Sequence, residues 1–244
     1  MQLSVLASGS SGNAAVVTSG ETRLLIDAGI SYRDLCGRLA GIGVDPESLT
    51  ACLVTHEHGD HSKAVPDIAR KLRIPIYLTR GTAHEIEWTG SPELFLMVDG
   101  GADFQIGTIS VKATAIPHDA LAPVCYALRS LEERIGIATD LGFIPESARE
   151  VLADCSTLLL ESSYDEDKLR NGDRHPFLKR RIDGALGHLS NRSVAEFIRE
   201  HLTDRTKRLV LGHISKECNT PELVKLNAME ALSQAGLTPS LETV

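Results

Sequence analysis

Short apolar runs bounded by turn residues recur through the first part of the chain and predict β-strands. These strands are expected at 3–7, 14–18, 23–27, 51–56 and 75–79. Amphipathic spacing predicts helices that begin near Ser31 and cover 64–72 and 81–88. Helices and strands are therefore interleaved in this region rather than segregated.

The pattern changes between Phe95 and Asp140, where it becomes mostly β, with hairpins expected. After Asp140 helices and strands alternate again, and the last helix starts at Thr220 with Pro221 in its first turn. The strands expected between Phe95 and Asp140 cover 108–117, 123–130 and 134–140. After Asp140, strands are expected at 156–162 and 207–213, and helices at 145–153, in the region up to Arg181, and at 193–202.

The order of elements is α/β, then β-rich, then α/β again. It favours a mixed α/β (α+β) fold built as a four-layer αββα sandwich, with two mixed sheets face to face and helices outside, over a doubly wound parallel sheet. No linker or low-complexity run divides the chain. We expect a single domain over 1–244 whose two αβ halves meet near 129–134.

Composition limits the class of protein. The 244 residues are 42% hydrophobic, which is ample for a buried core, and no stretch approaches the roughly 18 apolar residues of a membrane span. Five cysteines without a Cys-x-x-Cys pair, and an N-terminus without a signal-peptide pattern, favour reduced thiols and a cytoplasmic location.

The formal charge of −8 argues against sequence-independent coating of nucleic acid, although it permits one local cationic site. The stretch "RNGDRHPFLKRR" at 170–181 is such a place. It is either a solvated helix face or a contact for substrate phosphates.

The stretch "THEHGDH" at 55–61 carries the strongest chemical signal. Imidazole and carboxylate side chains are packed into six residues directly after an apolar strand, which suits Zn²⁺, Mn²⁺ or iron without thiolates. His56 and His58 can face one cation, while Asp60 and His61, where the chain turns into a helix, can face a second.

One motif cannot complete two coordination spheres, so further ligands are expected at other strand ends. Three candidates follow apolar runs, namely His118, Asp140 and His213. A strand-end His or Asp standing alone is usually a hydrogen-bonded turn residue, but together with the motif these three favour a metal centre.

The whole set of residues resembles the metallo-β-lactamase fold superfamily of binuclear hydrolases, and the resemblance spans essentially the whole chain. By that likeness two divalent ions are bound, one by His56, His58 and His118, and the other by Asp60, His61 and His213, with Asp140 bridging them. Asp27, which ends the "LLID" strand, would support the ligand loop, or would be an ordinary capping aspartate.

Two nearly identical stretches, "LGHLS" at 186–190 and "LGHIS" at 211–215, are not a repeat by this interpretation. His213 is a ligand, whereas His188 resembles the histidine that tRNase Z and its relatives pair with a strand-end glutamate, here Glu161. Such a pair protonates the leaving oxygen, because an alkoxide leaving from phosphorus is strongly basic. The alternative is a helix-capping histidine beside a strand-end acid.

Several longer stretches, among them "SGSSGNA" at 8–14 and "GHISKECNTP" at 212–221, resemble the YycJ-type branch, whose members act as 5′-to-3′ DNA exonucleases. Ala64, Cys125, Ser163 and Tyr164 depart from the residues common there, and the last two follow Glu161. Candidate substrate contacts are Ser10, Asn13, Arg174, Lys179, Arg180 and Asn191.

The resemblance implies a binuclear phosphodiesterase that removes nucleotides from the 5′ end of DNA rather than RNA. A metal-bridging hydroxide would be the nucleophile, and Asp60, Glu161 and His188 would be the catalytic side chains. Two other functions stay open: a small-molecule metallo-hydrolase, such as a cyclic phosphodiesterase or a glyoxalase II-like thioesterase, and a metal-binding regulatory module without turnover. The sequence does not fix the oligomeric state.

Overall fold

A computed structural model of the protein describes residues 1–86 and 91–244, and the chain divides into two compact units. Unit 1 comprises Met1–Ala115 and Ala120–Glu132, and unit 2 comprises Ile116–Asp119 and Glu133–Val244. The division after residue 132 falls within the region where two halves were expected to meet. The single-domain organisation stays a prediction.

Unit 1 contains a six-stranded sheet whose strands follow one another in sequence order. The strands are β1 (Gln2–Ala7), β2 (Ala14–Ser19), β3 (Thr22–Ile26), β4 (Ala51–Leu53), β5 (Ile76–Thr79) and β6 (Phe95–Val98). The pairs β1–β2 and β2–β3 are antiparallel, and those from β3 to β6 are parallel. The five strands expected here are confirmed, four of them with small shifts at their ends, whereas the strand expected over 51–56 ends at Leu53.

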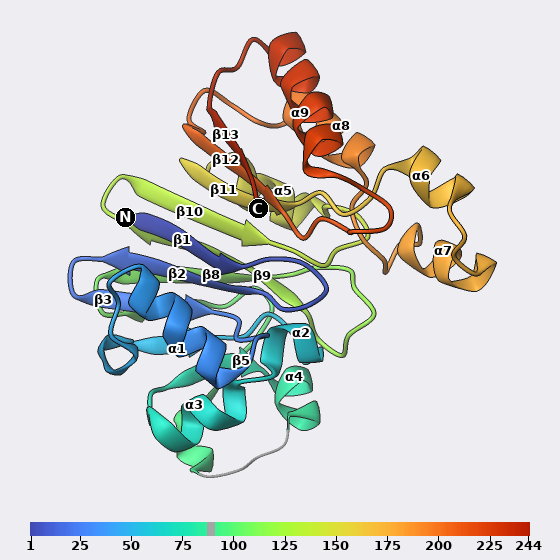
Figure 1. The fold of residues 1–244 in the computed structure, drawn as a ribbon. Helices are drawn as coiled ribbons and strands as arrows, with labels where there is room; N and C mark the ends of the chain where they lie inside the picture. Colours follow the sequence, from blue (N-terminus) through green and yellow to red (C-terminus); the bar gives the residue numbers. More distant parts are fainter. Residues whose placement is uncertain (87–90) are drawn as a thin grey trace. The chain divides into compact units, whose positions relative to one another are not determined.

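Helices α1 (Tyr32–Gly41), α3 (Val65–Lys71) and α4 (Arg80–Glu85) supply apolar side chains to the core beside this sheet (Figure 1). Ser31 caps α1, since its side chain accepts a hydrogen bond from the Asp34 amide. The helix expected over 81–88 begins one residue earlier and ends at Glu85, while residues 87 and 88 lie outside the described part of the chain.

An antiparallel ladder of β7 (Asp103–Ile106), β8 (Ile109–Ala115) and β9 (Val124–Ser130) completes the strands of unit 1 and confirms the β-rich region. Strand β9 also fixes the chain just before the histidine motif. The fully buried Tyr126 donates its hydroxyl to the Val54 carbonyl at 2.9 Å, and the Val124 amide donates to the Thr55 carbonyl at 3.0 Å. The motif therefore starts from a rigid anchor.

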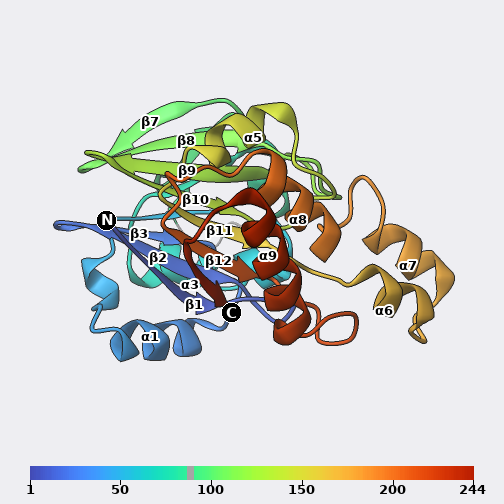
Figure 2. The same cartoon turned by 90° about the horizontal axis from the view of Figure 1, so that it is seen from above.

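Unit 2 is built on a parallel ladder of β10 (Glu133–Ala138), β11 (Thr157–Glu161), β12 (Arg208–Gly212) and β13 (Ser240–Thr243). Strand β13 was not expected, because the sequence "SLET" has no apolar run. In the structure its residues alternate between exposed and half-buried. Helices α8 (Asn191–Glu200) and α9 (Pro221–Ala235) lie side by side (Figures 1 and 2). Helix α5 (Glu146–Ala153) follows β10.

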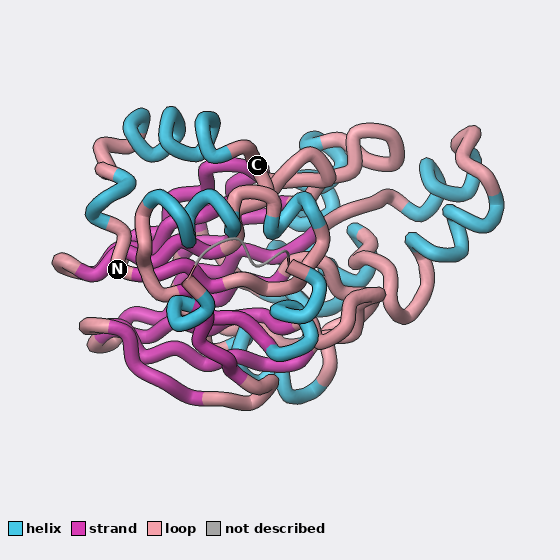
Figure 3. Tube along the Cα trace, turned by 90° about the horizontal axis from the view of Figure 1, so that it is seen from below, coloured by secondary structure: helices cyan, strands magenta, loops and turns pink. Residues whose placement is uncertain are grey.

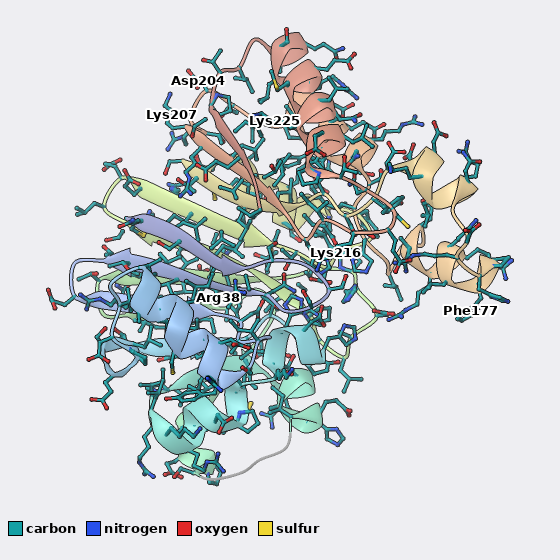
Figure 4. All side chains as sticks on the ribbon, in the orientation of Figure 1. Arg38, Phe177, Asp204, Lys207, Lys216 and Lys225 are labelled. Carbon is teal, nitrogen blue, oxygen red and sulfur yellow. The ribbon has the colours of Figure 1, made fainter. Side chains whose placement is uncertain are left out.

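Helices α6 (Glu166–Asn171) and α7 (Pro176–Ile182) form a hairpin that extends away from the strands of unit 2 (Figures 2 and 3). A small cluster of Tyr164, Leu169, Cys218 and Ile182 anchors it. Phe177 projects from α7 and is 66% exposed (Figure 4). Among residues 1–86 and 91–244, no helix combines the length and apolar character needed to cross a bilayer.

Candidate functional site

The histidine motif folds in unit 1 as a tight loop followed by the short helix α2 (Gly59–Ser62), so the predicted turn into a helix is confirmed. The ring centroid of His56 lies 4.7 Å from that of His58 and 4.2 Å from that of His61. His56 and His61 are fully buried. An oxygen of Asp60 lies 3.8 Å from Nε2 of His61, so three imidazoles and one carboxylate are gathered within a few residues.

Asp27 supports this loop from the end of β3. Its carboxylate lies 2.8 Å from Nδ1 of His61, and it accepts hydrogen bonds from the amide and hydroxyl of Thr55 at 2.8 to 3.0 Å. A carboxylate can only accept, so Nδ1 of His61 carries the proton and Nε2 keeps its lone pair. The Thr55 hydroxyl also lies 3.0 Å from Nδ1 of His56. Asp27 thus orients His61 directly and is linked to His56 through Thr55.

The turn "SGSSGN" packs against the other side of the same loop. Asn13 donates its backbone amide to the Asp60 carbonyl at 2.8 Å, and its side-chain nitrogen lies 2.9 Å from Nε2 of His61. Gly29 comes so close that a Cβ added there would lie 1.6 Å from the Asp60 carbonyl oxygen. Only glycine fits this position without moving the loop that carries Asp60 and His61.

In unit 2 two histidines direct the same ring atom toward Asp140. Nε2 of His118 lies 3.8 Å and Nε2 of His213 lies 3.5 Å from Oδ1 of Asp140. The opposite nitrogen of each ring is fixed, since Nδ1 of His118 meets the Gly187 carbonyl at 3.1 Å and Nδ1 of His213 meets Glu161 at 2.8 Å. Metal-ligating histidines are typically held in this way, with one nitrogen anchored and the other presented.

Glu161, fully buried at the end of β11, lies at the centre of the polar network in unit 2. Its Oε1 lies 2.7 Å from Nδ1 of His188 and 2.8 Å from Nδ1 of His213. Its Oε2 accepts from the amides of Leu141 and Leu189 at 3.1 and 3.2 Å. The structure thus brings Glu161 and His188 together, and it adds His213 as a second partner.

These contacts shift the ionisation of the network. Burial alone would favour the neutral acid of Glu161, but the charge of His188 and the hydrogen bonds from His188 and His213 outweigh it and lower its pKa. Burial also opposes charge on His188, yet Glu161 and Asp140 prevail and raise the pKa of that ring. Burial lowers the pKa of His118 despite the nearby Asp140. His118 is therefore held in the neutral form that binds metals.

Three of the predicted site residues adopt left-handed backbone conformations where they follow strands. The φ angles of Asp27, Asp140 and His213 are 57°, 61° and 54°. Each such residue costs about 1–3 kcal/mol and persists only where the surroundings hold it. Such strain clusters at functional sites.

The chain is similar over most of its length to proteins of one superfamily. The model of the Beta-lactamase superfamily domain matches residues 22–214. The chain belongs to the beta-lactamase superfamily. Exodeoxyribonuclease WalJ of Streptococcus pneumoniae is 36% identical over 242 residues, covering 96% of this chain and 89% of that protein. Exodeoxyribonuclease YycJ of Bacillus anthracis is 32% identical over 241 residues, covering 97% and 90%.

Among solved structures, the metallo-β-lactamase fold protein YhfI of Bacillus subtilis is similar, with a TM-score of 0.76 and 14% identity, covering 99% of this chain and 95% of that one. At that identity the likeness concerns the fold alone. The predicted metallo-β-lactamase fold and the resemblance to the YycJ-type branch are both confirmed.

The side chains of this superfamily member fit divalent metal ions. In unit 2, Nε2 of His118 and Nε2 of His213 both lie within 3.8 Å of Oδ1 of Asp140, so two imidazoles and a carboxylate converge. In unit 1, the motif supplies imidazole and carboxylate donors, and Asp27 and Thr55 hold two of its rings in place. Imidazole and carboxylate are the ligands that zinc, manganese and iron accept. The protein is a metal-dependent hydrolase.

The six predicted substrate contacts differ in exposure and in the partners they bond. Ser10 is exposed, whereas Asn13 is buried and bonded within the ligand loop. Asn191 is also buried, and it exchanges hydrogen bonds with Ser162 and Asn219. Arg174 forms an ion pair with Glu217 at 2.9 Å. Lys179 and Arg180 line a pocket of unit 2, which makes them the best placed of the six.

Sequence reasoning missed two contributors to the network. Thr55, the first residue of the motif, was not among the predicted site residues, yet its hydroxyl links Asp27 to His56. Gly29, two residues after Asp27, was not among them either, yet it makes the close approach to Asp60 possible. A threonine and a glycine carry no ligand chemistry of their own, so only their contacts reveal the role.

Proposed function

We propose that the protein is an exonuclease that cleaves phosphodiester bonds of DNA from the 5′ end. Two relatives that match nearly the whole chain are named exodeoxyribonucleases, which supports DNA as the substrate class. The observation that carries the proposal is the 2.7 Å contact between Glu161 and His188, because this pair supplies what a poor leaving group needs. A cytoplasmic location remains a prediction.

The ligand assignment of the proposal rests on superfamily membership. His56, His58 and His118 would hold one metal, Asp60, His61 and His213 would hold the other, and Asp140 would serve both. Such metals would lower the pKa of coordinated water toward about 7 and polarise the phosphoryl oxygens.

The acid step is assigned to His188. Nδ1 donates to the ionised Glu161, so the ring is held in one orientation and its positive charge is stabilised. Nε2 lies on the opposite edge of the ring and carries the proton to be transferred. As the water oxygen bonds to phosphorus and the bond from phosphorus to O3′ breaks, O3′ takes this proton and leaves as a hydroxyl. Asp60 accepts the proton that the water loses.

The dyad also distinguishes the proposal from a thioesterase. A thiolate leaves readily without protonation, whereas an alkoxide is strongly basic and gains about 10²–10⁴-fold from a positioned acid. A buried glutamate that orients a histidine would be superfluous for thioesters. It is the arrangement expected for phosphate esters of alcohols.

The decisive experiment is digestion of 5′-phosphorylated DNA and matched RNA, labelled at either end, with Mn²⁺ and separately with Zn²⁺. We expect mononucleotides to be released from the 5′ end of DNA by the wild type, and no release by Asp60→Ala. Release from the 3′ end would refute the proposed polarity. No cleavage by a protein with two bound metals per chain would refute the nuclease and favour small phosphodiesters or thioesters.

A further inference from the structure

A pocket of about 390 Å³ lies in unit 2 between α6, α7 and the start of α8. Four cationic side chains line it, Arg170, Lys179, Arg180 and Arg192, together with the acids Glu166 and Asp183. The lining therefore carries a formal charge of +2, four positive less two negative, in a chain whose formal charge is −8.

Both acids of the pocket are engaged by neutral donors. The hydroxyl of Tyr164 donates to Asp183 at 2.6 Å, and the hydroxyl of Ser190 donates to Glu166 at 3.1 Å. These bonds hold the carboxylates against the protein. Arg170 and Arg192 also pair with acids outside the lining, Asp167 and Glu196, at 3.1 Å each. Lys179 and Arg180 are therefore the cations of the lining that are left to meet an anion.

The pocket is preformed rather than a chance gap between surface helices. Tyr164 and Leu169, each only 4% exposed, belong both to its lining and to the small apolar cluster that anchors the hairpin. The Lys179 ammonium donates to the Arg170 carbonyl at 2.8 Å, which ties α7 to α6. Planar guanidinium groups on a fixed frame suit phosphate, which they bind through paired hydrogen bonds.

The pocket is built from the same two segments that carry the dyad. Tyr164 follows Glu161 by three residues, so their Cα atoms are at most about 11 Å apart. Arg192 follows His188 by four residues, and Tyr164 and Ser190 form an isolated parallel β-bridge. The pocket is therefore next to the two segments that carry the dyad.

From this placement we infer that the pocket binds the terminal 5′-phosphate of the DNA strand. The inference rests on the proposed function. When the bond from phosphorus to O3′ breaks at the first linkage, the departing group is the 5′-terminal nucleotide, whose O3′ faces His188. The next phosphate toward the 5′ end of the strand is the terminal 5′-phosphate. A cationic pocket beside His188 accounts for attack from that end.

The test compares the double variant Arg180→Ala with Arg192→Ala against the matched control Lys168→Ala with Arg199→Ala. The control removes the same charge from exposed positions of α6 and α8 outside the pocket lining. For the holoenzyme, we expect KM to be lower for 5′-phosphorylated than for 5′-hydroxyl DNA. The pocket variant should raise KM for the phosphorylated strand about tenfold or more, with little change in kcat, and should abolish the preference.

A binding measurement distinguishes failure of this inference from failure of the nuclease proposal. Calorimetric binding of 5′-dTMP and of thymidine to the holoenzyme needs no cleavage. If DNA is not cleaved but the pocket variant alone loses affinity for 5′-dTMP, the pocket stands and the nuclease proposal fails. If the pocket variant binds 5′-dTMP as the wild type does, or keeps the preference for a 5′-phosphate, the inference is overturned.

Discussion

Nδ1 of His213 lies 2.8 Å from Oε1 of Glu161, the same oxygen that lies 2.7 Å from Nδ1 of His188. One buried carboxylate thus serves a proposed metal ligand and a proposed acid at once. The metal site and the leaving-group site are coupled through this group, and substitutions in the network should separate into those that affect one and those that affect both.

Glu161→Gln should impair both functions. The amide keeps the shape but removes the negative charge that stabilises a charged His188. It also replaces one accepting oxygen by an NH2 donor, so it cannot accept both from the two rings and from the amides of Leu141 and Leu189. Loss of a carboxylate behind a ligating histidine typically costs 10–100-fold in metal affinity. We expect metal content after dialysis and kcat to fall together. Full metal content with full activity would contradict the shared role.

His188→Ala should lower the rate without loss of metal. With a poor leaving group, such as a nucleoside O3′, we expect a decrease of about 10²–10⁴-fold, and with 4-nitrophenyl esters a much smaller one. His201→Ala, at the end of α8, is the control. Equal decreases for good and poor leaving groups would exclude the acid role.

Asp27→Asn should weaken metal binding from a distance. Asparagine tolerates the left-handed backbone at this position. Its amide is neutral and has one accepting oxygen, so it cannot replace the carboxylate that accepts hydrogen bonds from both His61 and Thr55. We expect a 10–100-fold lower metal affinity and about 1–3 kcal/mol less unfolding free energy. Competition with a chelator dye and urea titration measure the two effects, and Asp34→Asn, on the exposed side of α1, is the control.

Gly29→Ala should destabilise unit 1, since the added Cβ collides with the backbone of Asp60 and His61. An overpacked contact costs about 1–3 kcal/mol. Gly37→Ala is the matched control, because nothing lies within 4 Å of a Cβ at this exposed helical position. It should instead gain about 0.5–1 kcal/mol. Equal effects in urea unfolding would show that the close approach is unimportant.

The pair of Arg208 and Glu242 should make a small part of stability depend on pH. Two hydrogen bonds of 2.8 Å join them, and these lower the pKa of Glu242. A lowered folded pKa means that the contribution is present above the unfolded pKa of about 4.3 and is lost as pH falls through the folded value. With Glu242 44% exposed, the contribution is below about 1 kcal/mol.

Urea unfolding of Glu242→Gln at neutral pH and at about pH 3 measures this contribution, with Glu230→Gln on α9 as the control. The difference from wild type should shrink in acid for Glu242→Gln. A difference that does not depend on pH would assign the effect to packing.

The site could be predicted from the sequence where its geometry is local. The motif residues from His56 to His61 are close in the chain, so the backbone itself brings their side chains together. Residues that follow apolar runs, such as Asp140 and His213, could be found because a strand end is visible in the hydrophobic pattern. Strand β13 was missed for the converse reason, since it has no apolar run.

What tertiary structure decided was the use of each polar side chain. Arg174 pairs with Glu217, and Asn191 is buried against Asn219, and neither partner is visible in the sequence pattern. Sharing of Glu161 by two histidines, and the gathering of four cations between α6, α7 and α8, likewise depend on segments far apart in the chain. Sequence spacing fixes which groups are available, whereas hydrogen-bond partners and burial, set by packing, decide what each group does.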